Sequence, residues 1–143
     1  MKILKTINRF NNIILPYDAA LLAFRVIIAS QLIIVHGLKK VGIGTGTAEV
    51  VPNPFDLPDA FNQVFAIASN LIFPLFVIIG WYTRLAIIPI LAVTLSGYFV
   101  VHWNDSLLEK DIPFMYSVAF LFIAYSGPGK YSIDRLLAKN SYL

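Results

Sequence analysis

The chain has 143 residues, of which 58% are hydrophobic and 13% are charged, and its mean hydropathy is +0.75. A soluble domain of this size needs a larger charged surface, so the composition favours lipid as the solvent of the protein. The formal net charge is +3, but the basic residues flank apolar segments, so we expect no nucleic-acid partner. The lack of cysteine excludes disulfides, thiolate nucleophiles and cysteine-held iron–sulfur clusters within the chain.

Residues 1–15 combine basic and apolar side chains ahead of the first long apolar segment. The apolar ones recur at helical spacing, at Ile3, Leu4, Ile7, Phe10 and Ile14. This pattern predicts a short amphipathic helix on the membrane surface. No small-residue cleavage site follows, so a cleavable signal peptide is not expected.

Four apolar segments are long enough, or nearly so, to cross a membrane, which takes about 17–25 residues. They run over residues 18–37, 61–81, 84–102 and 112–126. The fourth is the shortest and ends at the Gly-Pro-Gly sequence of residues 127–129, because glycine and proline terminate helices. We therefore predict an all-α fold, a membrane-embedded bundle of four transmembrane helices that forms a single domain over residues 1–143.

The basic residues predict how these segments are oriented. The larger group falls on the side of both termini and consists of Lys2, Lys5, Arg9, Arg84, Lys130, Arg135 and Lys139. The smaller group, on the other side, consists of Lys39, Lys40 and Lys110. Because cytoplasmic loops carry the excess of lysine and arginine, we expect both termini in the cytoplasm.

Arg25 lies inside the first predicted span, where an arginine costs about 2.5–3.5 kcal/mol on insertion scales. It either reaches the nearby headgroups with its flexible stem or serves a function inside the bundle. His36 follows on the same segment, and at 3.6 residues per turn the two side chains are about 20° apart around the helix. We therefore expect Arg25, Leu32 and His36 to share one inward face that continues to Lys39 or Lys40.

Polar side chains of all four segments are expected to converge near the outer membrane interface. His36 and His102 end two helices that run in the same direction. The other expected members are Lys40, Gln63, Asn70, Tyr98 and Tyr116, with Gln63 and Asn70 on one face of the second span. Pockets between bundle helices are common ligand sites.

A flat quinone headgroup fits such a pocket, with the tail in lipid. We predict that His36 and His102 handle protons, and that Arg25, Lys40, Gln63, Asn70, Tyr98 and Tyr116 bind the ligand. Two alternatives stay open for the histidines, a haem held between them and simple interfacial hydrogen bonds. No HExxH, CxxC or Walker sequence occurs, and no metal site is predicted.

Three stretches resemble the DoxX family of small bacterial membrane proteins, namely FRVIIASQLIIVHGLKKVG, VIIGWYTRLAIIPILAV and FLFIAYSGPGKYSIDRLL. The residues that fit the family pattern are Arg25, His36, Gly37, Lys40, Gly80, Arg84, Gly127, Gly129, Ser132 and Asp134. The resemblance implies a four-helix bundle in the bacterial cytoplasmic (inner) membrane and an association with redox work. Relatives act as a membrane subunit of thiosulfate:quinone oxidoreductase or join complexes that protect against oxidative and thiol stress.

We therefore expect a DoxX-like integral membrane protein that binds a quinone or similar amphipathic ligand between its helices. If it takes part in catalysis, it would be a subunit of a quinone-linked oxidoreductase, with a redox partner subunit or as a homo-oligomer. Covalent sulfur chemistry would need such a partner, because the chain has no cysteine. The alternatives are a non-enzymatic scaffold or accessory subunit, and a carrier of anions or small molecules with Arg25 on its path.

Overall fold

The structure is a computed structural model that describes residues 16–140, and the amphipathic helix predicted over residues 1–15 lies outside that range. Between residues 16 and 140 the chain forms helices and no strand. The first long helix consists of α2 (Tyr17–Leu32), η1 (Ile33–Gly37) and α3 (Leu38–Lys40), and the second of α4 (Asp59–Ile67), η2 (Ala68–Ile72) and α5 (Phe73–Ile79). The remaining elements are α6 (Thr83–Ser96) continued by η3 (Gly97–Val101), then α7 (Leu107–Ser126) and α8 (Ile133–Asn140).

Three of these helices are long and apolar enough to cross a membrane, and α7 is the fourth of the bundle. The three are Tyr17–Lys40, Asp59–Ile79 and Thr83–Val101. The prediction of an all-α membrane bundle is confirmed, and the chain is a multi-pass membrane protein. Many large apolar side chains are exposed on its outside, as expected when the surrounding solvent is lipid.

The helix α7 begins at Leu107, five residues before the start predicted for the fourth span. Its extra turn carries Glu109 and Asp111, which precede the predicted span 112–126. A capping box explains the earlier start, since the Ser106 N–H donates to Oε2 of Glu109 over 3.1 Å.

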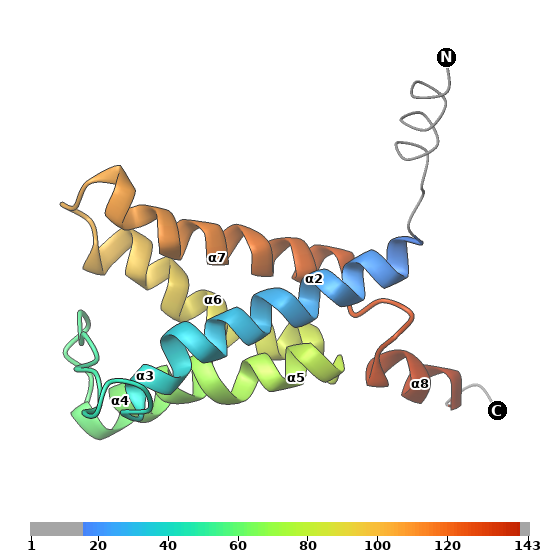
Figure 1. Ribbon diagram of the computed structural model, residues 1–143, viewed down its shortest axis with the longest axis horizontal. Helices are drawn as coiled ribbons and strands as arrows, with labels where there is room; N and C mark the ends of the chain where they lie inside the picture. The colour runs from blue at the N-terminus through green and yellow to red at the C-terminus, as the bar shows by residue number, and fades with distance from the viewer. Residues whose placement is uncertain (1–15, 141–143) are drawn as a thin grey trace, which may run out of the picture.

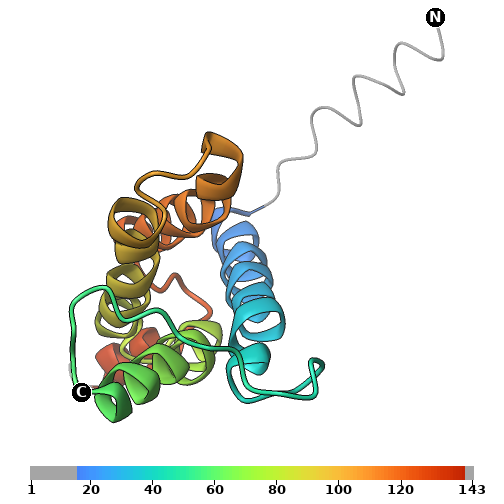
Figure 2. The same ribbon diagram turned by 90° about the vertical axis from the view of Figure 1, so that its left-hand side faces the viewer.

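The four long helices are arranged in a ring. Figure 2 looks along the bundle from the end opposite the termini and shows α2, α7, α6 and α5 in that order around it. Contacts join α2 to α7, α7 to α6, α6 to α5 and α5 back to α2. Their shared core includes Ala29, Leu32, Val77, Ile87, Ile90, Phe120 and Ile123. Both described ends of the chain lie at one end of the bundle (Figure 1).

The segments η1, η2 and η3 are single turns of π-helix, which contain one more residue per hydrogen-bonded ring than an α-helical turn. The first two pack against each other. At this contact a Cβ atom on Gly37 would lie 2.5 Å from the carbonyl oxygen of Asn70, so only glycine lets the two backbones come this close.

Candidate functional site

A groove of about 550 Å³ lies between the first long helix and α7. Figures 1 and 2 show these helices close together near the termini and farther apart toward the other end. The groove is lined by Phe24, Ile28, Gln31, Val35, His36, Asp111, Ile112, Met115, Tyr116, Val118, Ala119 and Phe122. Most of these side chains are apolar, so the groove suits an apolar or amphipathic occupant.

The polar groups of the groove gather at the end away from the termini. His36 in η1 and Tyr116 in α7 meet edge to face, with 5.4 Å between ring centroids and 90° between ring planes. His36 is half-buried, and Gln31 and Asp111 are exposed nearby along the same walls. Imidazole, phenol, amide and carboxylate groups together can donate and accept hydrogen bonds and exchange protons.

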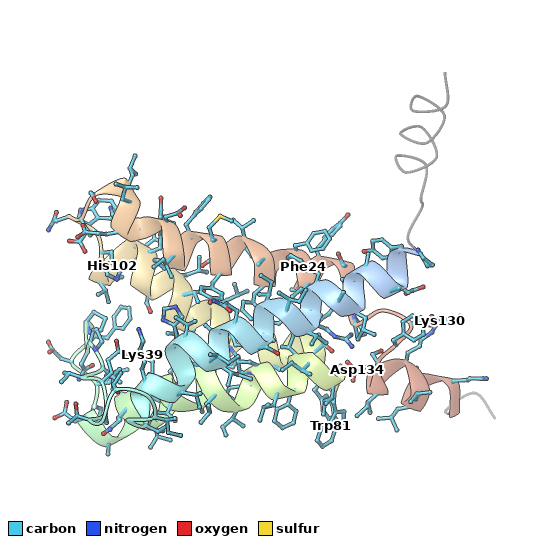
Figure 3. The ribbon with its side chains drawn as sticks, viewed as in Figure 1. Phe24, Lys39, Trp81, His102, Lys130 and Asp134 are labelled. Carbon is cyan, nitrogen blue, oxygen red and sulfur yellow. The ribbon has the colours of Figure 1, made fainter. Side chains whose placement is uncertain are left out.

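Aromatic rings mark the other end of the groove. Phe24 and Phe122 pack edge to face with 5.5 Å between centroids, and Figure 3 shows Phe24 where α2 passes α7. From Phe24 to His36 the helix rises about 18 Å. The groove is therefore polar at one end and apolar along the rest of its length, which matches the polarity of an amphipathic ligand.

Among the predicted ligand residues, the structure brings His36 and Tyr116 together and places several others elsewhere. The Lys40 Nζ atom is 3.5 Å from Oε2 of Glu49. Tyr98 packs against Phe114, with 5.7 Å between centroids, and lies below the ammonium group of Lys110. Neither Lys40 nor Tyr98 lines the groove.

His102 lies at the same end of the bundle as Lys39, as Figure 3 shows, but in a different setting from His36. Its Nδ1 atom is 2.7 Å from Oδ2 of Asp105, in the loop that follows η3. His102 is absent from the groove walls. The two histidines thus have separate partners, Asp105 for one and Tyr116 for the other.

Gln63 and Asn70, which are expected to share a face of the second span, differ in burial, and neither lines the groove. Asn70 is 4% exposed inside η2, whereas Gln63 is exposed in α4. The π-turn adds a residue to the turn that contains Asn70, which shifts the helical register. The first turns of α4 also extend past the packed part of the bundle, so most side chains there are exposed.

Arg25 is buried, with 1% exposure, and lies outside the groove. It does not reach the headgroups as a free side chain. Its Nη1 donates to the carbonyl of Pro128, and its Nη2 donates to the carbonyls of Tyr131 at 2.7 Å and Ile78 at 3.4 Å. The expected inward face is confirmed only for Arg25 and Leu32, which are buried along α2. His36, expected on the same face, is half-buried and lines the groove instead. In this position the guanidinium ties the loop after α7 to α2 and α5.

Further hydrogen bonds surround Arg25 and fasten the same loop. The Asp134 carboxylate accepts from the N–H groups of Tyr82 at 2.7 Å and Thr83 at 3.0 Å, which caps α6. The Asp134 N–H donates to the carbonyl of Gly80 over 2.9 Å. At the start of α2, Oδ1 of Asp18 accepts from the N–H of Lys130 at 2.8 Å.

We call this assembly the terminal cluster, and it consists of Asp18, Arg25, Gly80, Arg84, Gly127, Gly129, Ser132 and Asp134. Arg84 joins it through a 3.0 Å bond from Nε to the carbonyl of Ala124. Seven of the ten residues that carry the family resemblance belong to this cluster. Their common role in this structure is therefore to close the bundle at the end where the chain begins and ends.

Ten of the twelve groove residues were not predicted as members of a site, namely Phe24, Ile28, Gln31, Val35, Asp111, Ile112, Met115, Val118, Ala119 and Phe122. One signal for Gln31 was present, because a polar side chain inside an apolar span is a candidate for function. The eight apolar residues among them have no such signal, since any apolar residue of a span can face lipid, core or groove.

These features define a helical multi-pass membrane protein with a ligand-sized groove between two of its spans. The DoxX family model matches residues 20–103, more than half of the chain, and the protein belongs to the DoxX family. It is also 31% identical over 111 residues to an uncharacterized protein of Haemophilus influenzae, which covers 72% of this chain and 74% of that relative. No solved structure matches the chain.

Proposed function

We propose that this DoxX family member binds a quinone or a similar amphipathic ligand in the groove between α2 and α7. The observation that carries the proposal is the combination of a long apolar groove with the His36–Tyr116 pair at one end. Its volume of about 550 Å³ falls in the usual range of ligand pockets, about 300–1,000 Å³. A quinone ring beside His36 and Tyr116 would leave its tail along Ile28 and Phe24.

The polar end supplies groups that suit a quinone carbonyl. The Tyr116 hydroxyl and the His36 ring can donate hydrogen bonds to it, and the imidazole can also pass on a proton. Asp111 is exposed at the same end and can exchange protons with water. Reduction of a quinone takes two electrons and two protons, and in a quinone-linked oxidoreductase a redox partner subunit would supply the electrons.

The two alternative functions fare differently. The carrier hypothesis relies on Arg25 to attract an anion, but the carbonyls of Pro128, Tyr131 and Ile78 bind its guanidinium. No observation in residues 16–140 favours that hypothesis. The scaffold hypothesis remains the alternative, because the terminal cluster is a set of polar contacts that hold helices together.

The test uses the purified chain in lipid nanodiscs and a photoreactive quinone analogue. We expect crosslinks on peptides of α2 and α7, and a loss of affinity of about tenfold in Tyr116→Phe, which removes one hydroxyl. Tyr98→Phe is the matched control, since Tyr98 lies outside the groove. Crosslinks spread evenly over all helices, or equal losses in both variants, would reject the groove and favour the scaffold.

We also propose that the protein lies in the bacterial inner membrane with both termini in the cytoplasm. Among described residues, the end nearest the termini carries four exposed basic side chains, Arg84, Lys130, Arg135 and Lys139, besides the buried Arg25, and two acidic ones, Asp18 and Asp134. The other end carries three basic side chains against six acidic ones, Lys39, Lys40 and Lys110 against Glu49, Asp56, Asp59, Asp105, Glu109 and Asp111. The orientation is supported by the excess of lysine and arginine on the side of the termini, because these residues concentrate in cytoplasmic segments, whereas acidic residues contribute little.

The orientation can be measured directly, because the chain contains no cysteine to interfere. Single substitutions Thr45→Cys and Ala138→Cys place a thiol on an exposed residue at each end. A membrane-impermeant maleimide added to spheroplasts should label the first variant and leave the second unlabelled until the cells are opened. The reverse pattern would invert the proposed orientation.

A further inference from the structure

A second cavity, of about 910 Å³, lies at the terminal end of the bundle, between the start of α2 and the helix α8. Three basic side chains surround it, those of Lys130, Arg135 and Lys139. All three are exposed, and Figure 3 shows Lys130 on the loop that leads into α8. This cavity is separate from the α2–α7 groove and plays no part in the proposed quinone site.

The cavity has an excess of positive charge. Its one acidic side chain is Asp18, whose Oδ1 already accepts a hydrogen bond from the backbone N–H of Lys130. The ion pairs found between residues 16 and 140 are Lys40–Glu49 and His102–Asp105, both at the opposite end of the bundle. The three cations around the cavity therefore have no carboxylate partner in the described chain.

Its walls also contain apolar surface. Leu136 is 64% exposed on α8 and lines the cavity together with Pro128 and Ala138. The helix α8 is amphipathic, with basic and apolar side chains on different faces. Such a helix lies in the interface of a bilayer, with its apolar face among the lipid chains and its basic residues near the headgroups.

The cavity lies at the end of the transmembrane helices, at the level of the lipid headgroups. The helix α2 begins at Tyr17, α5 ends at Ile79, and α7 ends at Ser126, all at the terminal end. The cavity begins where these helices stop, and a bilayer has its phosphate groups at that level.

We infer that this cavity binds the headgroup of an anionic phospholipid, with its phosphate held by Lys130, Arg135 and Lys139 and its acyl chain beside Leu136. Basic pockets at the ends of transmembrane helices suit such headgroups because charge attraction and apolar burial act together. A soluble phosphate would satisfy the cations but leave Leu136 in water, so the lipid is the better match.

The test is native mass spectrometry of the full chain after exchange into vesicles of equal parts phosphatidylglycerol and phosphatidylcholine. We expect the protein to retain phosphatidylglycerol, and the variant Arg135→Gln/Lys139→Gln to retain about tenfold less of it. Lys39→Gln is the control for loss of an exposed charge at the other end and should behave as the parent chain. Because these side chains are exposed, the variants should keep the parent's melting temperature, which is measured on the same samples.

Two further arms separate a lipid from a free anion. Leu136→Ser should weaken phosphatidylglycerol retention although it removes no charge, and millimolar inorganic phosphate should displace little of the lipid. Full displacement by phosphate, with no effect of Leu136→Ser, would identify a soluble-anion site and overturn the inference. Equal retention of both lipids by the parent chain, or an equal loss in Lys39→Gln, would overturn it as well.

Discussion

The imidazole of His36 and the phenol of Tyr116 meet at a right angle, with 5.4 Å between ring centroids. This contact joins the end of the first long helix to α7 at the point where the two helices diverge. Both side chains also line the groove. The pair therefore serves the packing of the bundle and the chemistry of the groove at once.

The first prediction concerns the energy of this pair. A double-mutant cycle with His36→Ala and Tyr116→Leu should give a coupling of about 0.5–1.5 kcal/mol, typical of aromatic pairs. The measurement is unfolding in a titration of mixed detergent micelles. A second cycle with His36→Ala and Tyr98→Leu should give a coupling near zero, because His36 has its ring contact with Tyr116 and Tyr98 has its own with Phe114. Equal couplings in the two cycles would contradict the prediction.

The second prediction concerns the contact of the π-turns η1 and η2. Gly37→Ala should destabilise the bundle by about 1–3 kcal/mol, because its Cβ would lie 2.5 Å from the Asn70 carbonyl oxygen and the two backbones would have to separate. Gly97→Ala is the matched control. Gly97 also lies in a π-turn, but its nearest neighbour would be Pro113 Cβ at an ordinary 3.5 Å. Similar melting temperatures for the two variants would show that the contact tolerates a side chain.

The third prediction concerns the glycine beside Arg25. Gly80→Ala should be strongly destabilising, since Gly80 has a φ of +71° and its Cβ would lie 2.5 Å from Ser132 Cβ. Gly44→Ala controls for the backbone strain alone, because Gly44 has a φ of +86° with nothing within 4 Å of a Cβ. We expect about 1 kcal/mol from the strain and an additional loss of about 1–3 kcal/mol from the clash. Thermal unfolding monitored by circular dichroism would measure the stability of both variants. Equal losses in the two variants would show that the clash with Ser132 adds nothing to the cost of Gly80→Ala.

The fourth prediction separates a structural Arg25 from one that carries anions. Arg25→Lys keeps the charge, but the compact lysine ammonium cannot reproduce the bonds that the planar guanidinium makes to three carbonyls. We therefore expect this variant to lower the stability of the protein by about 2 kcal/mol or more. The exposed Arg135→Lys is the control and should change stability by less than about 0.5 kcal/mol. The measurement is unfolding in mixed micelles, with anion flux into liposomes recorded alongside. A stable Arg25→Lys variant with altered flux would restore the carrier hypothesis.

Much of the fold could be predicted from the sequence, because each transmembrane helix is recognised from one continuous segment. The length of its apolar run and the glycine and proline residues at its ends are enough. The four long helices and the buried face of Arg25 and Leu32 follow from hydropathy and helical spacing. The π-turns could not be predicted in this way, since an extra residue in one turn leaves the composition unchanged. Asn70 lies in such a turn, whereas Gln63 lies in the part of α4 that extends past the packed bundle.

The candidate site was predicted in part. His36 and Tyr116 were predicted as members of one site because each is a polar residue at the expected depth, and the structure places both on one groove. The partners of Arg25 could not be predicted, because they are backbone carbonyls and any residue type can provide one. Likewise, no pattern in α2 or α7 alone shows that these two helices are neighbours with a gap between them.

The bonds of Arg25 have a consequence for the synthesis of the protein. They join residue 25 to carbonyls 103 and 106 positions later in the chain. When the first span enters the membrane, those carbonyls have not yet been made, so the guanidinium must stay at the interface or be shielded by other groups. Only when residues 128–131 arrive can the charge settle into the bundle. The loop after α7 therefore completes the placement of the first long helix.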